Sequence, residues 1–179
     1  MIGKRGIGIA LSSLTLLASG IGWAPTTQAH TAGAHTVQDC TGRENITYGP
    51  GLGLSSEPAT VTVDGVYHCV DASGRGVTAE YHTEGTTAGT CLLLAWNRSE
   101  EILRYADGGK SVIAYRSGPS VRVLGLNTAK LEGVVVAGRG KGSVAEKIIQ
   151  TVPGSLPTDC VLADGIKRTT AFTHLSIQP

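Results

Sequence analysis

Four cysteines are the residues of this chain whose type and spacing restrict the chemistry most. They are Cys40, Cys69, Cys91 and Cys160. No Cys-x-x-Cys pair and no Cys/His cluster of ligand spacing occurs, so the sequence does not indicate a zinc site. In an exported chain, four cysteines predict two disulfides, and three connectivities are possible.

The amino-terminal segment predicts that these cysteines meet an oxidising compartment. Two basic residues, at positions 4 and 5, precede a short apolar stretch, and triplets ending at Ala29 and Ala34 are competent for cleavage. This is the pattern of a secretory signal peptide, and the apolar stretch is shorter than the about 20 residues that span a bilayer. We therefore expect a signal peptide over residues 1–29, with cleavage at 34 as the alternative. The mature protein should be secreted and extracellular, without a membrane span.

The histidines suggest metal chemistry as an alternative function. Cleavage after Ala29 would place His30 at the mature amino terminus, where a free amino group and an imidazole can chelate copper together. The arrangement would resemble the histidine brace of secreted copper proteins, once a second histidine completed it. The candidates are His35, His68, His82 and His174. Because the aromatic-rich surface of a polysaccharide oxidase is absent, we keep this site as an alternative and expect no cofactor.

Residue types that carry hydrolytic chemistry form no recognisable motif. There is no Gly-x-Ser-x-Gly elbow, and oxidised cysteines cannot act as nucleophiles. Glu100 and Glu101 are adjacent, so on a strand they would face opposite ways. Gly109-Lys110-Ser111 imitates a P-loop end but lacks the earlier glycine, and it predicts a hairpin turn. We assign no catalytic residue, and we expect that the protein is not an enzyme.

Three further sets of residues have a functional interpretation beside a structural one. Tyrosines and a tryptophan could form a carbohydrate platform, although core positions are favoured for them: Tyr48, Tyr81, Trp96, Tyr105 and Tyr115. Asn45 and Asn97 begin formal glycosylation sequons. Residues 138–142 predict a flexible turn with two exposed cations, Arg139 and Lys141.

Charge and composition exclude some classes of partner. Without Lys4 and Arg5, thirteen basic side chains stand against fourteen acidic ones, and they are scattered along the chain. Nucleic-acid binding depends on clustered Lys and Arg, so we expect no nucleic acid as a partner. The mature chain of roughly 145–150 residues has the length of one ordinary domain.

Val, Thr and Gly recur in a pattern that predicts short β-strands separated by turns. The segment from Ala59 to Cys69 alternates in phase through Gly65, as a half-buried strand does. The other strands are expected at 42–48, 77–84, 91–96, 99–106, 112–116, 121–126, 130–137, 143–152 and 169–177. Ala79, Tyr81 and Thr83 should point inward, and so should Leu175 and Ile177. The apolar run at 91–96 indicates a strand buried on both faces or a short helical start, and 99–106 has a helical alternative to the favoured hairpin strand. Turns are expected at 49–51, 71–74, 107–109 and 138–142, and a loop at 85–90.

Eight or nine short strands with regular turns indicate a sandwich or a barrel. We expect an all-β fold, a two-layer antiparallel sandwich of the immunoglobulin type. We expect a flexible arm over residues 30–39 and a single domain over 40–179. If the strand at 42–48 pairs antiparallel with the strand ending at Cys69, Cys40 and Cys69 lie at the same end. Cys91 would then pair with Cys160, although sequence alone leaves the connectivity open.

Two stretches carry a resemblance. Gly65-Val66-Tyr67-His68-Cys69 resembles the local pattern of the immunoglobulin F strand, where a tyrosine precedes the cysteine by two residues. With Cys40-Thr41-Gly42, residues 61–74 and Gly89-Thr90-Cys91, the chain resembles small secreted four-cysteine β-proteins of high-GC Gram-positive bacteria. That group implies a leader and one β-domain and supplies no active-site residues. We therefore expect a non-catalytic binding module for an extracellular protein or cell-wall polymer, or alternatively an inhibitor of secreted proteases that presents 85–90 or 153–158.

Overall fold

A computed structural model describes residues 38–91, 93–116, 120–123, 126–151, 160 and 165–179. All of them belong to one compact unit, residues 32–179. These described residues form nine strands, all paired antiparallel: β1 (Gln38–Leu52), β2 (Glu57–Asp71), β3 (Gly76–Thr90), β4 (Leu93–Tyr105), β5 (Lys110–Arg116), β6 (Ser120–Val123), β7 (Leu126–Gly138), β8 (Val144–Thr151) and β9 (Ile166–Gln178).

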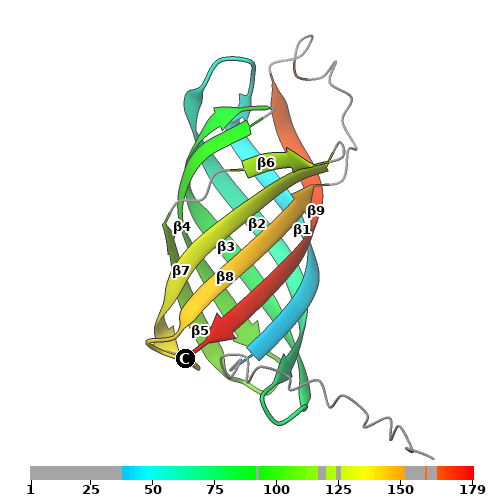
Figure 1. The fold of residues 1–179 in the computed structure, drawn as a ribbon, viewed down its shortest axis with the longest axis vertical. Coiled ribbons are helices and arrows are strands. Elements are labelled where there is room, and N and C mark those ends of the chain that lie inside the picture. Colours follow the sequence, from blue (N-terminus) through cyan, green and yellow to red (C-terminus); the bar gives the residue numbers. More distant parts are fainter. Residues whose placement is uncertain (1–37, 92, 117–119, 124–125, 152–159, 161–164) are drawn as a thin grey trace, which may run out of the picture. The chain divides into compact units, whose positions relative to one another are not determined.

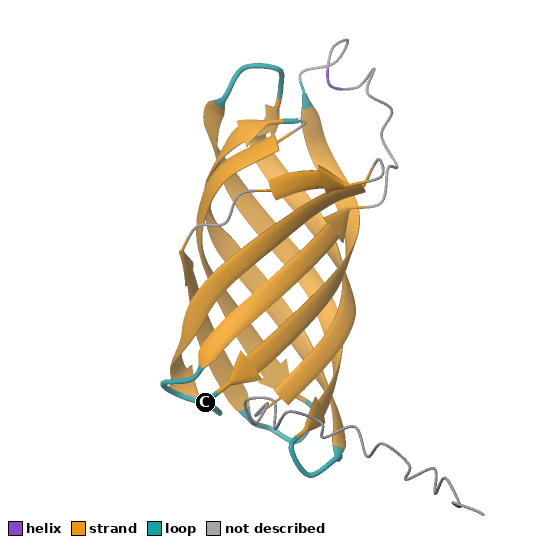
Figure 2. Ribbon diagram, in the orientation of Figure 1, coloured by secondary structure: helices purple, strands orange, loops and turns teal. Residues whose placement is uncertain are grey.

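The strands close into a barrel (Figure 1). Their order is β5-β4-β3-β2-β1-β9-β8-β7-β6, and β5 pairs in addition with β7, which joins the two ends of the sheet. Eight strands thus complete the wall seen in Figure 2, while the short β6 pairs with the first part of β7. The predicted two-layer, immunoglobulin-like sandwich is therefore wrong, because a single sheet curves until β5 pairs with β7.

Alternation along the strands decides which side chains fill the interior. In β2, Val61, Val63, Tyr67 and Cys69 are buried, while Thr60, Asp64 and His68 are exposed. This confirms the predicted single strand that stays in phase through Gly65. The predicted inward faces of β3 and β9 are also confirmed, since Ala79, Tyr81 and Thr83, and likewise Leu175 and Ile177, are buried.

Several predicted boundaries fall inside longer strands. The expected turn at 49–51 lies within β1, where the register with β9 shifts between Thr47 and Leu52. A bulge lets a strand continue past turn-forming residues at the cost of a local bend. The expected loop at 85–90 is the last part of β3 and pairs with both β2 and β4. β4 was expected to be buried on both faces near its start, but Trp96 is 40% exposed.

Glycines at inward positions make room for the tyrosine rings of the interior. Three tyrosines lie directly opposite a glycine of the neighbouring strand: Tyr67 opposite Gly42, Tyr81 opposite Gly65 and Tyr115 opposite Gly133. A Cβ atom added to Gly65 would lie 2.5 Å from Cζ of Tyr81. The missing side chains therefore leave the space that three large rings occupy in a narrow barrel.

The hairpin turns follow local chemistry. Asp71 accepts hydrogen bonds through Oδ1 from the backbone N–H groups of Ser73 and Arg75, at 2.9 and 3.0 Å. Gly74 follows with a φ of 80°, a conformation that glycine adopts without steric cost. The predicted turn at 71–74 is confirmed, and so is the hairpin between β4 and β5, in which Gly109-Lys110-Ser111 takes part.

Candidate functional site

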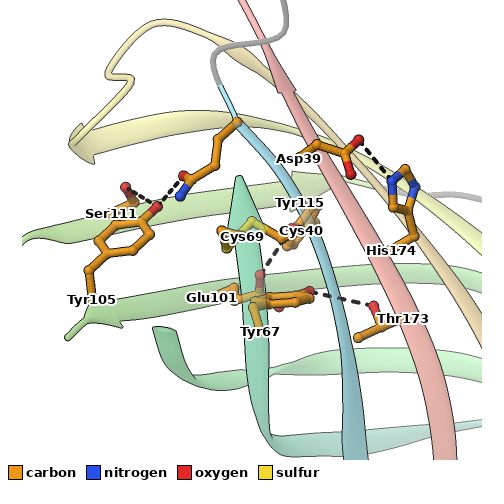
Figure 3. Close-up of a disulfide and its surroundings, with 11 residues drawn as sticks. Asp39, Cys40, Tyr67, Cys69, Glu101, Tyr105, Ser111, Tyr115, Thr173 and His174 are labelled. Carbon is orange, nitrogen blue, oxygen red and sulfur yellow. Dashed lines mark hydrogen bonds and ion pairs between the residues drawn. A yellow bond between two sulfur atoms is a disulfide. The ribbon is translucent and has the colours of Figure 1, made fainter. Parts of the chain in front are cut away.

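Both disulfides join segments that are distant in the sequence. Cys40 and Cys69 are direct register partners on β1 and β2, and their sulfur atoms are bonded inside the barrel (Figure 3). Cys91, which follows β3, is bonded to Cys160 across a sequence separation of 69 residues. The pairing expected from the strand order is confirmed, and two disulfides are compatible with an extracellular protein.

The middle of the barrel contains three ionisable side chains that contact one another. Lys147 of β8 places its Nζ 2.5 Å from Oε2 of Glu101 on β4 and 2.9 Å from Oε2 of Glu44 on β1. All three side chains are at most 1% exposed. Burying such charges is costly unless they are paired and hydrogen-bonded.

We call Lys147, Glu44, Glu101 and the side chains hydrogen-bonded to them the central cluster. Hydroxyl groups supply its further hydrogen bonds. The Tyr81 hydroxyl donates to Oε2 of Glu44 at 2.7 Å. Tyr115 donates to Oε1 of Glu101 at 3.2 Å, and Thr83 donates to Oε2 at 3.0 Å. Figure 3 shows Tyr115 reaching Glu101 beside the disulfide.

The electrostatics keep the lysine charged and the tyrosines neutral. Burial alone would lower the pKa of Lys147, but the carboxylates of Glu101 and Glu44 raise it well above its usual value. Burial raises the pKa of Tyr81 and of Tyr115, so both phenols remain donors. The ammonium also lies 4.6 Å from the centroid of the Tyr81 ring, within the range of a cation–π contact.

One oxygen of the cluster lacks a partner. Oε1 of Glu44 is buried, and no hydrogen bond reaches it from any described residue. Tyr67 stacks on Tyr81 with ring centroids 4.1 Å apart and closes the space on that side. The cluster is thus enclosed by side chains, and its geometry suits structural pairing better than contact with a substrate.

A second set of hydrogen-bonded polar side chains lies at the end of the barrel where β1 begins. The Tyr105 hydroxyl donates to Oε1 of Gln38 at 2.6 Å and lies 3.1 Å from Oγ of Ser111. The Arg139 guanidinium lies over the Tyr105 ring and binds both oxygens of Asp107, at 2.8 and 2.9 Å. The prediction that 138–142 carries two exposed cations is therefore wrong for Arg139, whose side chain is half-buried, at 33% exposed.

The histidines of the described chain lie on the outer surface and are separated. His82 contacts Asp64 through Nδ1 at 2.6 Å and Glu84 through Nε2 at 3.2 Å. Hydrogen bonds to Asp64 and Glu84 raise the pKa of His82. His174 contacts Asp39 at 2.9 Å, as Figure 3 shows, and His68 is exposed on β2.

The proposed copper site cannot be placed on these histidines. His30 and His35 lie outside the described residues, and the described part of the chain holds no group of three or more His, Cys, Asp or Glu suited to a metal ion. The copper alternative stays a prediction from sequence.

Other sequence-predicted candidates fall in different environments. Tyr48, Tyr81, Tyr105 and Tyr115 are buried core residues, and Trp96 alone of that set is exposed. Asn97 is 9% exposed and accepts a hydrogen bond from Ser99, whereas Asn45 is exposed on β1. Of the two loops proposed for protease inhibition, 85–90 is strand, and 153–158 lies outside the described residues.

Sequence reasoning missed the central cluster. The signal was present in part, since Glu101 was expected to face away from Glu100, and the register confirms that only Glu101 points inward. Nothing in the sequence marked Glu44 and Lys147 as its partners.

Comparison with known proteins adds no assignment, because no family model and no curated protein matches the chain. Within the described residues, no helix is long and apolar enough to cross a membrane.

Proposed function

We propose that the mature protein is exported and acts as a non-catalytic interaction module, binding an extracellular protein or a cell-wall polymer through the outer surface of the barrel. The proposal rests chiefly on the central cluster. The carboxylates of Glu101 and Glu44 raise the pKa of Lys147 well above its usual value, yet this lysine is buried beside Tyr67, Tyr81 and Tyr115, each at most 4% exposed. Chemistry with a substrate would need such groups to be accessible.

Two disulfides support the extracellular part of the proposal. They are common in proteins that leave the cytosol and uncommon in those that stay there. The outer surface supports the binding part, since it combines exposed apolar side chains with charged ones: Val66, Val134, Val144, Phe172 and Trp96 are each at least 40% exposed.

The test uses the exported protein purified from a culture of its host. We expect saturable binding to purified cell-wall material or to a culture-medium protein, measured by calorimetry, and no binding after reduction and unfolding. Amino-terminal sequencing of the same sample fixes the cleavage site, and a first residue other than His30 removes the copper alternative. Turnover of a hydrolase or oxidase substrate by the pure protein would contradict the non-catalytic assignment.

A further inference from the structure

Apolar side chains lie next to one another on the outer surface of β5, β7 and β8. Val134 of β7 is the direct register partner of Ala114 on β5 and of Val144 on β8, and the two valines are 45% and 53% exposed. Where the register of β5 with β7 shifts, β7 holds one extra residue, Val136, which is also 45% exposed. With the half-buried Val112 of β5, we call this surface the valine face and define it as Val112, Ala114, Val134, Val136 and Val144. An exposed apolar patch with a polar border is typical of a contact surface.

A row of four charged residues borders the valine face. Arg98 on β4 lies opposite Arg116 on β5, and both are exposed. Glu132 on β7 lies opposite Glu146 on β8, and their side chains are 67% and 41% exposed. The ladder between β5 and β7 ends one residue before Arg116 and Glu132, so these two charges occupy neighbouring positions. Across the four strands the row therefore carries two positive charges and then two negative ones.

Such a row is complementary to itself under a two-fold rotation. An axis parallel to the strands, between β5 and β7, would bring β5 of one copy against β7 of a second copy, and β4 against β8. Arg116 would then face Glu132 of the second copy, and Arg98 would face its Glu146, each pair occurring twice. The same rotation would place Ala114 against Val134 of the second copy. Apolar residues would thus meet at the centre, and opposite charges would meet along the border.

We propose that the valine face is the contact surface of a homodimer, in which a second copy of this chain covers it. The inference goes beyond the proposed function and does not depend on it. A purely apolar partner, such as a lipid surface, would remove water from the four charges without pairing them, whereas a second copy supplies the opposite charge at each position. Interfaces that bury less than about 1,200 Å² in total belong to weak complexes. Because the valine face is narrow, we expect a dissociation constant of about 10–100 µM.

The experiment measures sedimentation equilibrium of the exported protein from about 5 µM to about 500 µM, where we expect a monomer–dimer equilibrium. The double change Val134→Thr and Val144→Thr keeps the β-branched shape and places hydroxyl groups in the contact. It should weaken the dimer on the order of tenfold, because each change occurs twice in a two-fold contact. The matched control is Val66→Thr with Val70→Thr, at valines that are 43% and 49% exposed on β2. Since β3 and β4 separate β2 from β5, this control should dimerise as the wild type does.

Two charge variants test the pairing along the border. The acidic variant, Arg98→Glu with Arg116→Glu, makes all four charges of the row negative. The basic variant, Glu132→Lys with Glu146→Lys, makes all four positive. Each variant alone should sediment as a monomer, because like charges then face each other across the contact. An equimolar mixture of the two should form a heterodimer, because every position then meets an opposite charge, and this recovery also shows that both variants are folded.

A control of equal charge and the remaining outcomes complete the test. Arg43→Glu with Arg168→Glu changes exposed arginines of β1 and β9, so it should keep its own dimer and should not pair with the basic variant. A wild type that stays monomeric throughout, valine variants that weaken the dimer equally, or charge variants that do not pair with each other would overturn the homodimer. If the monomer still binds a culture protein or wall polymer, the proposed function stands without the dimer. If the dimer forms as described and nothing else binds, the proposed function is wrong and the homodimer stands.

Discussion

Replacing Lys147 by methionine should destabilise the barrel strongly, because it leaves two buried carboxylates without their cation. Methionine has nearly the same length, so the change tests charge more than volume. Removing one partner of a buried ion pair costs about 3–5 kcal/mol. Here two carboxylates, those of Glu44 and Glu101, both 0% exposed, lose the same ammonium partner. Domains of this size are stable by about 5–15 kcal/mol, so Lys147→Met should lower Tm by about 10–20 °C.

The neighbouring strand offers a matched control. On β7, Lys130 binds Glu132 at 3.2 Å and Glu146 at 2.8 Å, but its side chain is 48% exposed. The same set of side chains, one lysine and two glutamates, thus occurs once inside the barrel and once in water, where screening weakens the ion pairs. Lys130→Met should therefore leave stability almost unchanged.

The assay is equilibrium urea unfolding of the oxidised proteins, followed by circular dichroism and analysed by linear extrapolation. A triple variant, Lys147→Met with Glu44→Gln and Glu101→Gln, removes all three charges and keeps acceptors for Tyr81 and Tyr115. The triple variant should recover most of the lost stability, so that its free energy of unfolding lies within about 2 kcal/mol of the wild-type value. If Lys147→Met lowers the free energy of unfolding no more than Lys130→Met does, the buried ion pairing is refuted. If the triple variant is as unstable as the single one, packing and not charge explains the cost.

Three other predictions test separate features. Gly65→Ala should lower the free energy of unfolding by about 1–3 kcal/mol through overpacking, whereas Gly53→Ala, which has open space around its Cβ position, should not; thermal unfolding distinguishes them. The pKa of His82 is raised in the folded state, so its contribution to stability is fully present below the unfolded pKa of about 6.5 and is lost as pH rises through the folded value. An NMR titration in which His82 titrates below a denatured control would reverse that sign. Replacing Cys40 and Cys69 together by alanine should cost about 3–4 kcal/mol by the chain-entropy model, and thiol titration of the unfolded, unreduced wild type should find no free cysteine.

The sequence allowed the all-β class and most inward faces to be predicted, because alternation depends on neighbours along one strand. It did not allow barrel and sandwich to be distinguished. Both have strands of period two, and closure depends on β1 pairing with β9 and β5 with β7, far apart in sequence. Strand length was underestimated where Gly49, Pro50 and Gly85 gave local turn signals that the ladder overrides.

The central cluster was out of reach for a similar reason. Its members come from β1, β4 and β8, and each alone has the composition of a solvated strand face. In Ala145-Glu146-Lys147-Ile148-Ile149, one face carries lysine and the other glutamate, so polarity does not mark the interior. The glycine–tyrosine pairs were a usable signal, since Gly65 falls on the same face of its predicted strand as Tyr67, and Tyr81 was expected to point inward.

The pairing of the first strand with the last has a consequence for protein engineering. Gln38 lies opposite Ile177, and Asp39 opposite Ser176 in the same ladder, so the two ends of the barrel sequence are neighbours. A short linker could join position 178 to position 38, and the chain could be reopened at residues 53–56, between β1 and β2. Such a circular permutant would keep every ladder of the wall. It would move a genetic fusion from the end where β1 begins to the opposite mouth of the barrel.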